Sequence, residues 1–217
     1  MPALGTQTIS SNAIVGTYSK SSIGGTVTVF VSAATSNASA TITNTSNNFS
    51  NITVLGTTII SGWNQRDLGL TAKTINGNTF NNWSAGTGAI TGMVLNGFGL
   101  TSSVTNNTIS NLAGQAAITG MNVGTTGNAS SFSITSNTIT SLSSTGTGGN
   151  VIALISANPS VTVTINNNTI NTLSSTAVSA TLTEFRFLVV QEPKMLEEII
   201  LMVSQQLELQ VQRRTEY

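Results

Sequence analysis

The chain of 217 residues contains no cysteine and no histidine. Disulfides and thiolate metal sites are therefore excluded. Catalysis by a serine–histidine–aspartate or a cysteine–histidine set is excluded as well. The absence of cysteine leaves the redox compartment undecided.

Charged residues are also scarce, at 6% of the chain against about 25% in an ordinary soluble domain. Only Lys20, Arg66, Asp67 and Lys73 precede residue 184. The net charge is zero and no basic stripe is present, so we expect no nucleic-acid partner. Ser, Thr, Asn and Gly solvate the chain instead, and a steady supply of apolar residues with only 3 prolines argues against disorder.

Long hydrophobic runs are missing. The longest, at residues 151–155 and 199–203, are far too short to span a bilayer, so membrane insertion is not expected. Met1 is followed by neither a basic nor an apolar segment, and no signal peptide is visible.

The chain does contain a repeat of about 30 residues. An asparagine followed two residues later by a large apolar residue recurs at spacings of 31, 29, 30 and 31. These anchors are Asn47, Asn78, Asn107, Asn137 and Asn168. Apolar residues stand three positions before the last four anchors, whereas Ile42 in the first repeat lies two residues too early.

Within each unit, apolar residues alternate with Thr, Ser or Asn, which indicates β-strands. A second strand motif begins at Ile60, Ile90 and Ile118. Each unit is too small to bury its apolar face alone, and stacking in register about 4.8 Å apart solves this problem. The prediction is an all-β, right-handed parallel β-helix, since right-handed crossovers are the default.

The anchor asparagines have a structural interpretation and a functional one. A short amide side chain tolerates the left-handed αL conformation, and stacked amides can hydrogen-bond along the axis as a ladder. The functional alternative is a row of amides that binds a ligand.

Units such as residues 134–142 and 165–173, which read Ile-x-x-Asn-Thr-Ile-x-x-Leu, resemble pectin-lyase-like parallel β-helix proteins. They resemble more closely the long repeat-built surface proteins of bacteria. The resemblance covers about residues 41–183, and residues 7–40 are interpreted as a degenerate coil. It implies secretion and an extracellular or cell-surface location.

We therefore expect a repeat domain over residues 1–183, with clear repeats over 41–183, and an atypical tail over 184–217. The tail carries ten of the 14 charged residues, lacks glycine, and has no anchor near residue 198. It is interpreted as a strand over 185–190 followed by an amphipathic helix that could cap the coil stack, or as disordered.

The repeat domain offers few groups for chemistry. A glycosidase needs two carboxylates and calcium usually several, but this domain has only Asp67. Arg66, Asp67 and Lys73, beside Trp63, are interpreted as a solvated turn with an ion pair, the alternative being a lyase site. We expect no catalytic residues, no cofactor and no metal.

Trp63 and Trp83 could form a platform on which sugar rings stack. Both occupy positions that hold Met or Leu in other repeats, which favours packing in the core.

Two functions fit these observations. The first is a structural or adhesive segment of a larger secreted or cell-surface bacterial protein, without catalysis. The second is the non-catalytic, carbohydrate-binding part of a polysaccharide-active β-helix protein. Expected partners are surface glycans, or other copies of the chain through the open ends of the helix.

The tail also generates a prediction about the gene. If each codon is read one frame over, residues 198–203 can encode Asn-Asn-Phe-Asn-Gly, with asparagine at the expected anchor position. We hypothesise that the tail is frameshifted repeat DNA. Resequencing the locus should reveal a frame change near residue 184, and an intact reading frame through residues 184–217 would contradict it.

Overall fold

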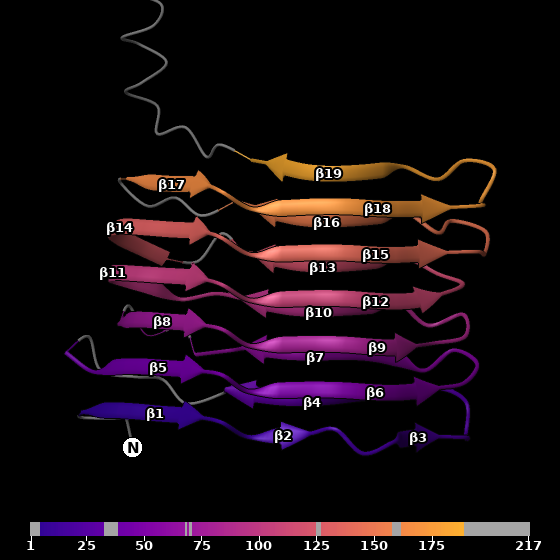
Figure 1. The fold of residues 1–217 in the computed structure, drawn as a ribbon, viewed down its shortest axis with the longest axis horizontal. Coiled ribbons are helices and arrows are strands. Elements are labelled where there is room, and N and C mark those ends of the chain that lie inside the picture. Colours follow the sequence, from indigo (N-terminus) through magenta and orange to yellow (C-terminus); the bar gives the residue numbers. More distant parts are fainter. Residues whose placement is uncertain are drawn as a thin grey trace, which may run out of the picture.

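The computed structural model describes residues 5–32, 39–67, 69, 71–124, 127–157 and 162–188. In these residues the chain winds into a parallel β-solenoid whose strands form three long sheets (Figure 1). No helix occurs in the described ranges. The all-β parallel solenoid is confirmed, and its handedness stays a prediction.

Each turn of the chain places one level of strands in the three sheets. Sheet A contains β1 (Thr6–Ser10), β5 (Thr41–Thr45), β8 (Ala72–Asn76), β11 (Phe98–Thr105), β14 (Gly127–Thr135) and β17 (Val163–Asn166). Sheet B contains β2 (Ala13–Ile14), β3 (Tyr18–Lys20), β6 (Asn48–Val54), β9 (Thr79–Ser84), β12 (Thr108–Gly114), β15 (Thr138–Ser144) and β18 (Thr169–Ser175). Sheet C contains β4 (Thr26–Ser32), β7 (Ile59–Gln65), β10 (Ile90–Leu95), β13 (Ile118–Val123), β16 (Val151–Ser156) and β19 (Leu182–Phe187).

Every strand pairs in parallel with the strand one turn away, so that like residues form columns along the axis. Ile109, Ile139 and Ile170 stack in this way in sheet B. The alternating pattern of the sequence turns these apolar residues inward and the intervening Ser, Thr and Asn outward. The interior is therefore one continuous apolar core, closed by neighbouring turns rather than by a second layer.

Glycine recurs in sheet C because the coils approach each other closely there. A Cβ built on Gly92 would lie 2.5 Å from the carbonyl oxygen of Gly120. A Cβ on Gly120 would lie 2.6 Å from the carbonyl oxygen of Ala153. The glycine of the second strand motif thus keeps adjacent coils at strand spacing.

The irregular first repeat is a substitution in the core and not a shift in register. Asn44 pairs with Ile75, and Ile42 pairs with Lys73, in an unbroken parallel ladder. The polar Asn44 therefore occupies the column in which an isoleucine was expected. The preceding coil is also formed, by strands β1 to β4.

The last described strand continues sheet C into the tail. β19 pairs with β16 and includes Phe185, which lies beside Leu154 in the core column. The sheet thus runs past the domain boundary expected at residues 183/184. The expected amphipathic helix lies outside the described residues.

Candidate functional site

The anchor asparagines form a single file of hydrogen-bonded amides along one corner of the solenoid. The Nδ2 group of each donates to Oδ1 of the next at 2.9 Å, across sequence separations of 29 to 31 residues. Asn47, Asn78, Asn107 and Asn137 are at most 1% exposed. The predicted ladder is confirmed.

Each buried amide in this ladder satisfies its hydrogen bonds completely. Asn107 Nδ2 donates to Asn137 Oδ1 at 2.9 Å and to the Ile75 carbonyl at 3.0 Å. Its Oδ1 accepts from the Asn78 backbone N–H and from Asn78 Nδ2. A buried polar group is expensive only when it is unpaired, so the ladder stabilises the turn at little desolvation cost.

The left-handed conformation belongs to the residue before each ladder asparagine, which corrects the sequence interpretation. Ser46, Gly77 and Asn106 have φ of 57°, 65° and 55°, and the ladder asparagines have negative φ. The turn needs a small or Asx residue at the first position and an inward amide at the second.

The ladder also contains an asparagine that the repeat search missed. Asn12 Nδ2 donates to Asn47 Oδ1 at 2.9 Å, across 35 residues. Asn12-Ala13-Ile14 carries the same asparagine-x-apolar signal, but its spacing exceeds the 29 to 31 residues of the others. A search that tolerated a longer connector would have found it.

Neither tryptophan can form a sugar-stacking platform, because both rings lie in the core. Trp63 is 0% and Trp83 1% exposed. Trp83 packs edge-to-face on Phe80 and donates its Nε1–H to the Phe49 carbonyl at 3.0 Å. The core-packing interpretation is confirmed, and the glycan-contact interpretation of Trp63 and Trp83 is wrong for this structure.

The Arg66–Asp67–Lys73 segment is not a solvated turn. Arg66 is exposed, but Asp67 and Lys73 are 1% and 0% exposed. Lys73 Nζ donates to the carbonyl oxygens of Gly69 and Gly97. Lys73 therefore links two successive connections between sheets C and A, the one that contains Gly69 and the one that contains Gly97, from inside the solenoid.

This corner concentrates buried polar side chains, and we call it the polar corner, comprising Gln65, Asp67, Thr71, Lys73 and Ser102. Ser102 Oγ accepts from the Lys73 backbone N–H and donates to the Gly99 carbonyl. Among the described residues of this corner, the side-chain polar atoms of Gln65 and Thr71 have no protein partner. Buried groups of this kind usually bind ordered water.

The polar corner is a poor active site. Burial lowers the pKa of Lys73 from 10.5 to about 8, and the negative charge of Asp67 acts in the opposite direction. An amine with this pKa is a competent base or nucleophile, but its ammonium lies out of reach of any substrate. The contacts of Lys73 indicate a structural role, in which the ammonium stabilises the connections that contain Gly69 and Gly97.

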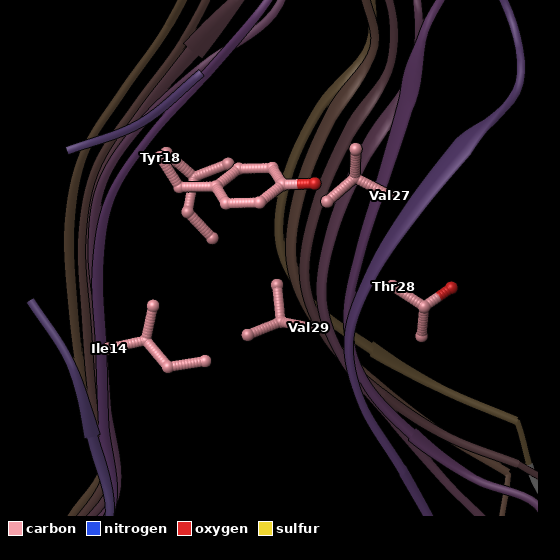
Figure 2. A pocket seen from close by; sticks show the side chains of 6 residues that line it. Ile14, Tyr18, Val27, Thr28 and Val29 are labelled. Atoms are coloured by element: carbon pink, nitrogen blue, oxygen red, sulfur yellow. The ribbon is translucent and has the colours of Figure 1, made fainter. Parts of the chain in front are cut away.

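The open first level holds an apolar pocket of about 100 Å³. Figure 2 shows Ile14 and Tyr18 on one wall facing Val27 and Val29 on the other. These residues begin columns that are fully buried in later levels, so the pocket is the uncovered end of the core.

The fold and the ladder define a parallel β-solenoid with a stacked amide corner. No protein-family model, curated protein or solved structure matches the chain. In the described ranges, His, Cys, Asp and Glu form no group of three that could hold a metal. The same ranges contain no helix with the length and apolarity needed to cross a membrane.

Replacing Asn107 by alanine tests the ladder. The change removes the acceptor of the buried Asn78 backbone N–H, one of the two acceptors of Asn78 Nδ2, and a donor to the Ile75 carbonyl, so the free energy of unfolding should fall by about 3 kcal/mol. Urea denaturation followed by circular dichroism measures it. Asn122→Ala, a half-buried position on the outer face of β13, is the control and should change stability by less than about 0.5 kcal/mol. Equal effects of the two changes would contradict the ladder's role.

The lysine makes stability depend on pH with a definite sign. Folded Lys73 loses its proton near pH 8 and the unfolded chain only near 10.5, so the unfolded state binds more protons between these values. The free energy of unfolding should therefore rise across this window, by up to about 3 kcal/mol.

Urea titrations at pH 7.5, 9 and 10.5 (roughly the window set by the two pKa values) measure this rise. Lys73→Met should remove it while retaining the contributions of other titrating groups. A wild-type slope equal to that of the methionine variant would contradict the buried, depressed amine.

Proposed function

We propose that this chain is a structural or adhesive segment of a larger secreted or cell-surface bacterial protein and performs no catalysis. The supporting observation is the unbroken amide ladder, which runs through every level from Asn12 to Asn168. A corner that repeats one hydrogen-bonding arrangement at every level is suited to building length and rigidity. Stability in such a solenoid grows by adding coils.

The outer surface supports the same proposal. The middle file of sheet A presents a hydroxyl at each level, from Thr8, Thr43, Thr74, Ser103, Ser133 and Thr164. The neighbouring file holds Ser10, Thr45, Asn76, Thr105, Thr135 and Asn166. An uncharged polar surface of this regularity keeps the rod solvated without electrostatic attraction to nucleic acid.

The extracellular location and the kinship to pectin-lyase-like proteins rest on the Ile-x-x-Asn-Thr-Ile-x-x-Leu resemblance. The proposal of no catalysis is supported by the two carboxylates in the described ranges, Asp67 and Glu184. Asp67 is buried in the polar corner and Glu184 lies on the last strand, so they do not flank one cleft. Other copies of the chain are the proposed partners, and surface glycans are the partners in the carbohydrate-binding alternative.

The gene itself tests the proposal. We expect the flanking DNA to encode further units of about 30 residues with the same anchor spacing, together with a secretion signal and a cell-wall sorting or anchoring domain. A locus that encodes no further units and no export signal would contradict a segment of a surface protein.

A binding and cleavage assay separates the carbohydrate alternative. The wild-type chain should neither bind a glycan array saturably nor release unsaturated products from polygalacturonate. Because Trp63→Ala and Trp83→Ala remove core side chains, binding must be measured first on the wild type. Saturable glycan binding would favour the alternative, and cleavage would contradict the absence of catalysis.

A further inference from the structure

We propose that the two ends of the solenoid bind each other, so that copies of this chain stack head to tail with their coils in register. The head face is the exposed side of β1, β2, β3 and β4, and the tail face is the exposed side of β17, β18 and β19 (Figure 1). The inference rests on the proposed structural role and concerns this chain by itself, whose two end faces are those that a flanking coil of a longer protein would cover. It adds the orientation in which copies of the chain associate.

The amide ladder has a direction, and this direction makes the two faces complementary. Every ladder asparagine donates toward the tail and accepts from the head side. Among the described residues, Asn12 Oδ1 accepts no hydrogen bond, and the Asn168 backbone N–H finds no acceptor. Asn168 of one copy can therefore donate to Asn12 of the next, as Asn137 donates to Asn168.

The same direction favours the head-to-tail arrangement over the symmetric ones, in which the ladder cannot continue. Two head faces would oppose Asn12 Oδ1 atoms, which are both acceptors, and two tail faces would oppose the donors of Asn168. Head-to-tail contacts are heterologous and continue as open filaments when they do not close into a ring. Because the coils add along a straight axis, we expect filaments (Figure 1).

The apolar columns also match across the two faces. Five columns of the core begin with an apolar side chain on the head and end with an apolar side chain on the tail. The pairs are Ile9 with Ile165, Ile14 with Ile170, Tyr18 with Leu173, Val27 with Leu182, and Phe30 with Phe185.

These side chains are partly exposed at the ends and fully buried inside. Ile14, Tyr18 and Phe185 are 42%, 45% and 42% exposed, whereas Ile139 and Leu154 in the same columns as Ile14 and Phe185 are 0% and 1% exposed. Stacking would cover the pocket shown in Figure 2 with the next coil's apolar side chains. It would also pair the open strand edges, which are templates for association.

One residue opposes this contact. Glu184 stands beside Ala153 in the file that also holds Gly120 and Gly92. A second copy on the tail face would bury its carboxylate, which costs free energy when no cation pairs with it. Glu184 therefore weakens stacking, and Glu184→Gly, which introduces the residue found at Gly92 and Gly120, should strengthen it.

The test uses the full chain, so that residues 189–217 are present, and three lysine variants. Sedimentation velocity over rising protein concentration should show growing assemblies for the wild type. Ile14→Lys blocks the head and Phe185→Lys blocks the tail. Each variant alone should stay monomeric at concentrations at which the wild type associates, because the substitution raises the concentration needed for association by more than about tenfold. Ile59→Lys is the matched control, because Ile59 is 43% exposed on the side of the rod.

The decisive sample is the one-to-one mixture of Ile14→Lys and Phe185→Lys. Each variant retains one working face, and the mixture should give a dimer containing one copy of each and nothing longer. Circular dichroism of each variant confirms that it is folded. Glu184→Gly should lower the association concentration and gives a second readout that does not depend on disrupting a face.

Several results would overturn the inference. These are a monomeric wild type, dimers of either lysine variant alone, a mixture that stays monomeric, or loss of assembly in Ile59→Lys. A monomeric wild type would leave the structural-segment proposal standing, because that proposal depends on the flanking DNA and on the glycan assays.

Discussion

Strict vertical register is the constraint on which this structure depends. Each coil is too small to hold a core, and its apolar residues are buried only if the next coil places equivalent residues directly above them. The amide ladder enforces this register, because an asparagine moved by one residue would leave four hydrogen-bonding groups unpaired inside the protein. The glycines of sheet C allow the coils to approach to the required distance.

The sequence predicted the fold because its signals are periodic. Alternation of apolar and polar residues indicated strands, and the 30-residue spacing of Asn78, Asn107, Asn137 and Asn168 indicated stacking. Two residues that depart from the average pattern, Asn12 and Asn44, were therefore not predicted correctly. Asn12 was missed because the connector between it and Asn47 is longer than the others. Asn44 was not recognised as a core residue because a polar side chain in a sequence gives no sign that it is buried.

The polar corner could not have been found from sequence. Lys73 lies on a strand position that holds Ile42 in the preceding level, and its ammonium turns toward two carbonyl oxygens that come close to it only in the folded chain. A charged residue in a weakly charged chain is expected at the surface, and the burial of Asp67 and Lys73 reverses this expectation. The buried lysine, with its lowered pKa, makes one corner of the solenoid sensitive to pH.

Regularity along the axis has a consequence at the ends. A stack whose coils all present the same columns has no intrinsic reason to stop, so its ends must be blunted by charge or covered by another element. Glu184 on the last strand is a charged residue of the kind that opposes pairing at an open strand edge. Lys20 on the first level donates to the Ser22 and Gly24 carbonyls. In repeat proteins, the pairing of strand edges and the burial of apolar columns add each new coil, and charge or a covering element at the last coil stops further addition.

Hydrogen exchange of side-chain amides, measured by NMR, tests whether the asparagine amides are stacked and buried in the corner of the solenoid. We expect the Nδ2 protons of Asn78, Asn107 and Asn137 to exchange slowly, because each lies in the buried ladder. The exposed Asn82 and Asn111 amides on sheet B should exchange rapidly in the same sample. Ladder amides that exchange as rapidly as those of Asn82 and Asn111 would contradict the stacked corner.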